Sequence, residues 1–340
     1  MINTVYRLIA PGMIDVACTE PDIKNSVILR PEYLSVCKAD QRYYLGNRSR
    51  EVLKAKLPMA LIHECCARVV FDPTGNFKAG ELVVPVPNIP TEDDDVIAEN
   101  YRLSSRFCSS GYDGFLRDYI DMTPDRLVRV PENVDPKIAS FAELISVAVH
   151  AVSRFERFSH SRKNSIGIWG DGNVGFITAL ILKALYPETK LYIFGTVYEK
   201  LGYFAFADGA YHVDHVPEGL KIDHAFECVG GEGSRFALAQ IIDLINPEGT
   251  VGLMGVSERF VDINTRMVLE RGLCLFGSSR SGVEDFQKTM DILSENPKIC
   301  AYLENLIGHV AEIKSISDIH AAFAQDISRN FGKTVLKWDK

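Results

Sequence analysis

The sequence predicts an α/β protein in which a β-rich domain accompanies a doubly wound parallel sheet. Over the first 150 residues, short β segments such as SVILRP, CARVVFD and ELVVPVP are separated by Gly and Pro. From about residue 164, apolar strands alternate instead with helices of roughly 10–15 residues. That alternation is typical of parallel strands covered by helices.

The elements of the second part follow from its apolar spacing. The expected strands are 164–170, 190–195, 221–231 and 249–256. The expected helices are 173–188, 199–209 and 234–245. The tail, ending FGKTVLKW, predicts a helix and a strand that rejoin the β-rich part. We therefore expect one domain at 1–150 with 296–340, and a second domain inserted at 151–295.

Composition excludes several classes of protein. The apolar fraction of 46% and charged fraction of 24% are ordinary for a globular chain, and the net charge of -8 argues against a nucleic-acid binder. No run approaches the roughly 18–20 apolar residues of a membrane span, and the start MINTVYRLIAPG lacks the pattern of a signal peptide. A cytoplasmic location without a membrane partner is the resulting expectation.

The stretch IGIWGDGNVGF carries a GxGxxG pattern between an apolar strand and an apolar helix. Gly170 permits a tight turn, Gly172 permits close approach of a pyrophosphate, and Gly175 permits close packing of helix on strand. Asn173 and Val174 open the helix, whose free N–H groups favour an anion. The pattern predicts a Rossmann dinucleotide site, with a ligand-free glycine turn as the alternative.

The choice of dinucleotide depends on the end of the second strand. An NAD site usually places Asp or Glu there for the ribose 2′-hydroxyl, but this chain continues Gly195-Thr196-Val197. Thr196 and Lys200 would instead suit a 2′-phosphate, so we predict NADP(H). Lys200 as an ordinary solvated helix residue remains the alternative.

The stretch LPMALIHECCARVVFD places His63, Glu64, Cys65 and Cys66 in a row. Successive strand residues point to opposite faces, so all four cannot hold one ion. Locally, a metal site, a redox pair and a buried strand all remain open.

Three stretches together resemble the medium-chain dehydrogenase/reductase family, in its zinc-dependent polyol branch. SVCKAD resembles the zinc-cysteine motif, LIHE the Gly-His-Glu motif, and SFAELISVAVHAV the segment that supplies a glutamate ligand. The resemblance implies a GroES-like catalytic domain and one catalytic zinc held by Cys37, His63 and Glu143, with Glu64 beside them. Three protein ligands leave the fourth position open, as in catalytic zinc sites. A buried thiol, a satisfied histidine and a capping glutamate form the alternative.

The same resemblance assigns further residues and exposes departures. AFECVG and LMGVSE resemble cofactor-lining strands and place Cys228 and Gly255 there. Ile62 replaces the motif's glycine, and Ala39 stands where a Ser or Thr often relays the proton. Only Cys108 lies where many members carry four cysteines, so a structural zinc is not expected. Cys65 and Cys66 are expected to be packing residues.

Within the family, DQRYYLGNR, SSGYDGF and GSSRSG resemble the ribulose-5-phosphate reductases, which make ribitol 5-phosphate for CDP-ribitol and teichoic-acid or capsule synthesis. This implies a sugar-phosphate substrate, a homodimer and a ribitol-5-phosphate cytidylyltransferase as a partner. Lys38, Arg42 and Arg280 are the candidate phosphate ligands. The alternatives are a dehydrogenase of another polyol or alcohol, and a zinc-free NADPH-binding regulator or quinone-reductase-like protein.

Overall fold

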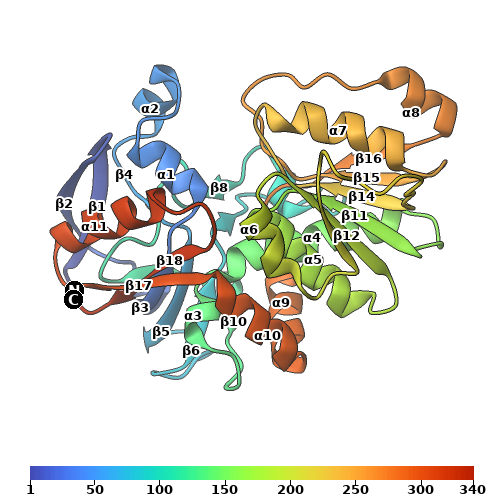
Figure 1. The fold of residues 1–340 in the computed structure, drawn as a ribbon. Coiled ribbons are helices and arrows are strands. Elements are labelled where there is room, and N and C mark those ends of the chain that lie inside the picture. The colour runs from blue at the N-terminus through green and yellow to red at the C-terminus, as the bar shows by residue number, and fades with distance from the viewer. The chain divides into compact units, whose positions relative to one another are not determined.

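A computed structural model describes residues 1–340. The chain divides into two compact units, the first made of Met1–Ser146 with Arg280–Lys340 and the second of Val147–Ser279 (Figure 1). The expected boundary at 296 therefore lies too late. Helix α9 (Val283–Glu295) packs against strand β10 (Leu127–Arg129), which assigns it to the first unit. The Asn133 side-chain amide also donates to the carbonyl of Ser294 at 2.8 Å.

A mixed sheet forms the centre of the first unit, in the order β10-β6-β5-β3-β18-β17, with β9 also paired to β3. After β10, its strands are β6 (Leu82–Pro85), β5 (Glu64–Phe71), β3 (Val27–Ser35), β18 (Lys333–Trp338), β17 (Ile307–Ile313) and β9 (Ile120–Met122). Ser35 is the register partner of Glu64 on one side and of Val335 on the other. The last strand of the chain thus lies beside one of the first.

Smaller elements complete the first unit. Three strands form a second sheet in the order β2 (Met13–Thr19), β1 (Asn3–Ala10) and β4 (Met59–Ala60), and β7 (Asn88–Ile89) pairs with β8 (Arg106–Phe107). Its helices are α1 (Lys38–Tyr44), α2 (Arg50–Lys56), α3 (Pro136–Ala139), α10 (Pro297–Leu303) and α11 (Ile316–Ile327), with 3-10 turns η1 (Glu99–Tyr101), η2 (Pro124–Arg126) and η4 (Glu304–Leu306). Leu34, Phe323 and Leu336 are fully buried in its core. Each such side chain contributes about 1.5–3 kcal/mol of hydrophobic free energy.

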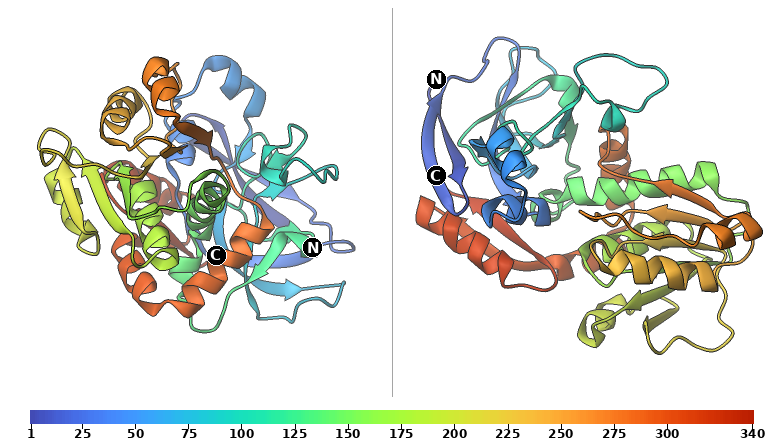
Figure 2. Two further views of the ribbon diagram at one scale, coloured as in Figure 1. Left: turned by 90° about the vertical axis from the view of Figure 1, so that its right-hand side faces the viewer. Right: turned by 90° about the horizontal axis from the view of Figure 1, so that it is seen from above.

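The second unit contains the expected parallel sheet. Its order is β13 (Gly209–His212), β12 (Lys190–Gly195), β11 (Ser165–Trp169), β14 (His224–Glu227), β15 (Thr250–Leu253) and β16 (Cys274–Gly277). This is the doubly wound 3-2-1-4-5-6 arrangement. All strands are parallel, and the order in which the chain adds them to the sheet reverses between β11 and β14. Helices cover both faces of the sheet (Figure 2). The helices of this part of the chain are α4 (Ala142–Phe158, which begins in the first unit), α5 (Asn173–Leu185), α6 (Tyr198–Leu201), α7 (Gly233–Leu244) and α8 (Thr265–Arg271).

One expected helix is much shorter than its pattern indicated. The stretch 199–209 was expected to be helical throughout, but α6 ends at Leu201 and a 3-10 turn, η3, covers Gly202–Phe204. Gly209 then begins strand β13. The apolar residues of this stretch are buried as a helical pattern predicts, since Phe204 and Phe206 pack against Phe176 of α5. They do so from a turn rather than from a helix.

His224 fixes the start of β14 as a neutral, fully buried ring. Its Nδ1 accepts the backbone N–H of Thr250 at 3.1 Å, and its Nε2 lies 2.9 Å from the carbonyl of Arg162. Burial, with His160 nearby, lowers the pKa of His224 to about 4. The sheet therefore depends on this ring's remaining unprotonated.

No helix of the chain has both the length and the apolar composition needed to cross a membrane.

Candidate metal and dinucleotide sites

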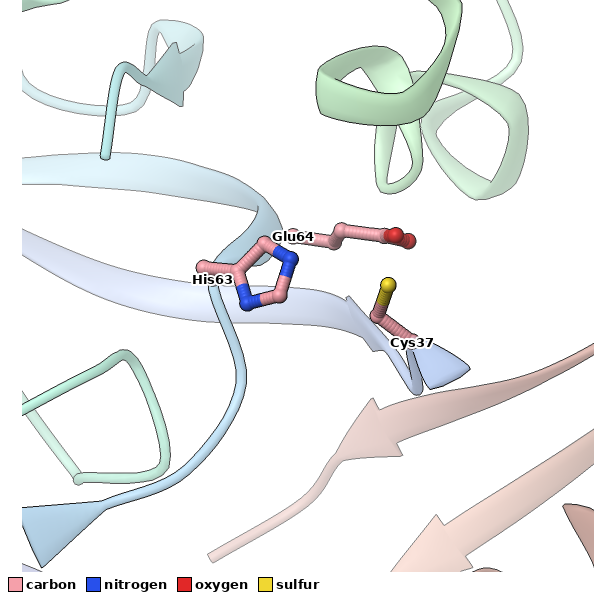
Figure 3. Close-up of side chains that lie close together, drawn as sticks. All are labelled: Cys37, His63 and Glu64. Carbon is pink, nitrogen blue, oxygen red and sulfur yellow. The ribbon is translucent and has the colours of Figure 1, made fainter. Parts of the chain in front are cut away.

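Three side chains of the first unit converge where β3 ends and β5 begins. Cys37 follows β3 and is the N-cap of α1, His63 precedes β5, and Glu64 is its first residue. Their possible ligand atoms lie within 4.8 Å of one another (Figure 3). Pairing of β3 with β5 sets this proximity, because the partner of Glu64 in the register is Ser35, two residues before Cys37.

Glu143 approaches the same cluster from the first turn of α4. Its Oε2 lies 3.8 Å from Nε2 of His63, and the side chain is buried. The four residues assigned from the zinc motifs are thus brought together. Tetrahedral zinc with bonds of about 2.0–2.3 Å holds its ligand atoms roughly 3.3–3.8 Å apart. The distance between His63 and Glu143 lies in that range, whereas the separations of up to 4.8 Å among Cys37, His63 and Glu64 would have to contract around the ion.

Asp40, which the sequence analysis did not single out, ties the two metal-site segments together. Its carboxylate accepts the backbone N–H of Cys37 at 3.1 Å and that of Ile62 at 2.9 Å, and Oδ1 lies 3.7 Å from Nδ1 of His63. Ile62, which replaces the motif's glycine, adopts the left-handed φ of 70° expected of a glycine and is fully buried. The position of Asp40, three residues after Cys37, was the available signal.

Lys333 of β18 is the second residue that the sequence analysis missed. Its ammonium lies 2.8 Å and 3.0 Å from the two carboxylate oxygens of Glu64 and donates to the carbonyl of Val36 at 3.1 Å. Lys333 and Glu64 are both buried. Because 269 residues separate them, no local pattern could reveal the pair.

The electrostatics of the cluster favour a cation. Burial, reinforced by Glu64, raises the pKa of the Cys37 thiol, although a hydrogen bond with His63 opposes this. Burial and Glu64 also raise the pKa of Glu143 to about 7, against the influence of His63. A divalent cation would stabilise the anionic forms of both groups. The sulfur, nitrogen and carboxylate donors suit zinc.

The neighbouring cysteines have a different role. Cys65 and Cys66 are buried in β5 outside the cluster, and burial raises the pKa of both thiols. Cys108 is likewise buried in the core of the first unit. All three behave as small apolar residues.

In the second unit, the three glycines of the turn meet the steric demands expected of them. Gly170 has φ of 127°, and an added Cβ would lie 2.8 Å from the carbonyl oxygen of Cys228. A Cβ at Gly175 would lie 2.0 Å from the carbonyl oxygen of Gly170. At Gly172 it would meet nothing within 4 Å, so that face is open to a ligand.

A cavity of about 560 Å³ adjoins this turn. Of the expected cofactor residues, Gly170, Gly172, Thr196, Lys200 and Cys228 line it. Gly175 is buried behind the turn, and Asn173 and Val174 form the first turn of α5 without lining the cavity. Gly255 follows β15 and is also outside the lining; its N–H donates to the carboxylate of Glu227 at 3.1 Å.

The end of the second strand has no carboxylate of its own, but one reaches it from the glycine turn. Asp171, from the glycine turn, accepts the backbone N–H groups of Thr196 at 2.7 Å and Val197 at 2.9 Å. Its other oxygen lies 3.7 Å from the ammonium of Lys200. A Cβ at Gly195 would lie 2.7 Å from the Asp171 side chain, which explains the glycine. Strand pairing brings Asp171 here, so sequence spacing alone could not place it.

The three candidate phosphate ligands occupy different settings in the first unit. Lys38 is exposed on α1, and its ammonium bonds the side chain of Gln41 at 3.1 Å. Arg42 is half-buried in the last turn of the same helix. Arg280 is half-buried over the ring of Phe107, which itself neighbours His63.

Comparisons with known proteins agree with this architecture. Residues 23–132 match the alcohol dehydrogenase GroES-like domain. Ribulose-5-phosphate reductase of Bacillus spizizenii is 52% identical over 340 residues, covering all of both chains. Ribulose-5-phosphate reductase 2 of Staphylococcus aureus is 54% identical over 339 residues and 99% of both chains. The crystal structure of Staphylococcus aureus TarJ in complex with NADPH superposes with a TM-score of 0.90 at 48% identity, covering all of both chains.

Full-length identity above 50% and a shared fold leave one assignment. The chain belongs to the medium-chain dehydrogenase/reductase family, alongside the proteins named ribulose-5-phosphate reductase.

Proposed function

We propose that this protein reduces D-ribulose 5-phosphate to D-ribitol 5-phosphate with NADPH. The observation that carries the proposal is the cluster of Cys37, His63 and Glu64, with Glu143 3.8 Å from His63. It occurs in a chain 52% identical, over its full length, to a protein named ribulose-5-phosphate reductase. Close relatives that share a whole chain and a polar constellation commonly share a reaction, whereas the fold alone hosts many.

In this proposal Cys37, His63 and Glu143 would hold one zinc ion, with a fourth position open. Bound zinc supplies a Lewis acid that polarises a carbonyl oxygen. Asp40 links the backbones of Cys37 and Ile62, and its carboxylate lies 3.7 Å from Nδ1 of His63. Lys333 balances the charge of Glu64 and keeps that carboxylate beside the other three side chains.

NADPH would occupy the cavity beside the glycine turn and supply the hydride. The TarJ structure at 48% identity contains NADPH, which supports this choice of cofactor. The carboxylate of Asp171 does not preclude a 2′-phosphate, because two backbone N–H groups and Lys200 offset its charge. The hydroxyl of Thr196 and the ammonium of Lys200 would contact the phosphate.

The product would supply a cytidylyltransferase that makes CDP-ribitol for teichoic-acid or capsule synthesis. Ribitol 5-phosphate carries the phosphate that such an enzyme couples to a nucleotide. A homodimer is proposed from the habit of the family. Sedimentation of the purified protein tests the dimer, and co-purification with the cytidylyltransferase tests a lasting complex.

NADPH consumption with ribulose 5-phosphate is the direct experiment. We expect rapid oxidation of NADPH with ribulose 5-phosphate and far slower oxidation with ribulose. Equal rates with both would instead favour a general polyol dehydrogenase. Metal analysis without zinc, together with no turnover of either sugar, would favour an NADPH-binding regulator.

A further inference from the structure

Arg280 is a half-buried cation of the first unit that forms no ion pair, although the carboxyl of Glu143 is close enough to act on its charge. It begins the second segment of that unit, and its backbone is in the left-handed region, with φ of 59°. The guanidinium packs against the ring of Phe107, whose centroid lies 4.7 Å from Cζ. Arg126, by contrast, pairs with Glu99 and Asp125. Burial lowers the pKa of Arg280, which indicates a desolvated charge.

Phe107 connects this cation to the metal-site residues. Its ring centroid lies 5.4 Å from that of His63, and the guanidinium of Arg280 packs against the same ring. The distance from His63 to Phe107 and the distance from Phe107 to Arg280 are each comparable to the length of a few carbon–carbon bonds. A phosphorylated five-carbon sugar is therefore long enough to reach from His63 to Arg280.

The backbone at Arg280 is anchored to the helix that carries Glu143. The hydroxyl of Ser281 lies 2.7 Å from that of Ser146, and Ser146 donates to the carbonyl of Glu143 at 2.7 Å. All three residues are buried. This bonding fixes the point from which the Arg280 side chain leaves the backbone, as a preorganised site requires.

Further positive charge surrounds the ring of Tyr43, which is close enough to Arg280 to act on its charge. Arg48 lies 5.2 Å and Lys56 5.9 Å from the centroid of that ring. Lys56 also donates to the hydroxyl of Ser110 at 2.7 Å. The positive charge of Arg48 and Lys56 therefore adds to that of Arg280, against the nearby carboxyl of Glu143, and favours a dianion over a neutral sugar hydroxyl.

We propose that Arg280, stacked on Phe107, receives the phosphate group of the substrate. Guanidinium binds phosphate through two parallel N–H···O bonds, and a partly desolvated guanidinium gains more from such bonds than an exposed one does. Among the three candidate cations, Lys38 is exposed and bonded to Gln41, and Arg42 lies on the helix rather than beside Phe107. This inference rests on the proposed function, because it assumes a phosphorylated sugar.

The test compares two substrates in the zinc-loaded enzyme with NADPH. For Arg280→Met we expect kcat/KM with ribulose 5-phosphate to fall about 100-fold, while the low value with ribulose changes less than about twofold. Arg280→Lys retains the charge but not the paired bonds and should lose about tenfold. Arg106→Met is the matched control, because Arg106 is exposed on the same strand as Phe107 and should behave as wild type. Equal losses with both substrates, or none, would overturn the inference.

Calorimetric binding of ribulose 5-phosphate separates this inference from the proposed function. If wild type binds the sugar phosphate but does not reduce it, the proposed reaction fails while the binding site can still be judged. Weaker binding by Arg280→Met than by Arg106→Met then supports the site. Equal binding by the two variants, or no binding by wild type, overturns it.

Discussion

The buried pair of Lys333 and Glu64 provides a stringent test of the structure. Replacement of Lys333 by Met retains most of the apolar stem but removes the ammonium that lies 2.8 Å from the Glu64 carboxylate. Glu64 has no exposed surface, so water cannot take the place of the lost partner. We expect the first unit to lose stability through a stranded negative charge.

The magnitude follows from two limits. Breaking a buried ion pair by removing one partner costs about 3–5 kcal/mol of the free energy of unfolding. A carboxyl that has lost its partner can avoid part of this cost by taking up a proton. Protonation of an ordinary glutamic acid costs roughly 4 kcal/mol at pH 7, and about 1.4 kcal/mol less for each pH unit below pH 7. We therefore expect Lys333→Met to lose about 3–4 kcal/mol at pH 7 and only about 1 kcal/mol at pH 5.

The chain offers a specific optical reporter for this measurement. Its 2 tryptophans, Trp169 and Trp338, lie in different units. In a Trp169→Phe background, fluorescence during urea unfolding reports on β18 alone. Chelator-treated protein should be used, since a bound metal would offset the charge. Lys337→Met is the matched control, because Lys337 is exposed on the same strand, and we expect it to change stability by less than about 0.5 kcal/mol.

A second variant isolates the charge from the loss of packing. Adding Glu64→Gln to Lys333→Met removes the stranded charge, so most of the lost stability and its pH dependence should disappear. A loss below about 1 kcal/mol at pH 7, or the same loss at pH 5 and pH 7, would refute the reasoning.

Three further predictions concern the metal, the cofactor and pH. We expect metal analysis to find about one zinc per chain, and two zincs would contradict this. Cys37→Ser should abolish zinc retention and turnover. NADPH binding, measured by fluorescence, should persist in this variant because the Gly170–Gly175 turn lies in the other unit. Thr196→Asp should reduce the preference for NADPH over NADH in steady-state rates by about tenfold or more, by opposing the 2′-phosphate; an unchanged ratio would contradict the cofactor site. The pKa of His224 is lowered to about 4, so the unfolded state binds more protons than the folded state between pH 6.5 and 4. As the pH falls through that range, the free energy of unfolding of the second unit should decrease by up to about 3 kcal/mol. Trp169 fluorescence would report this loss. In His224→Gln this pH dependence should be weaker.

Local periodicity and short motifs carried much of the prediction. The alternation after residue 164 predicted the parallel sheet, which the structure and its relatives confirm. The residues assigned from the family motifs, among them Cys37 and His63, also lie together in the structure. Their roles in holding zinc stay a prediction. Motif order succeeded here because each residue lies at an end of a strand or helix that periodicity could locate.

The interactions that sequence reasoning missed all depend on pairing between distant segments. Lys333 reaches Glu64 only because β18 is inserted beside β3. Asp171 reaches Thr196 only because β11 and β12 pair in parallel. Neither residue type nor spacing records such strand order, and a single apolar run such as 199–209 does not distinguish a helix from a packed turn.

The separation of 269 residues between Glu64 and Lys333 has a consequence for biosynthesis. At roughly 5–20 residues per second, the ribosome adds the lysine about 15–50 s after the glutamate. Throughout that interval β3 also lacks its neighbour β18, and all of Val147–Ser279 is synthesised before the interval ends. The inserted unit can therefore fold while the nascent first unit still has an open sheet edge and an unbalanced carboxylate. A ribosome that stalls shortly before Lys333 would leave a chain whose second unit is complete. The first unit of that chain would be incomplete and would be bound by chaperones or cleaved by proteases.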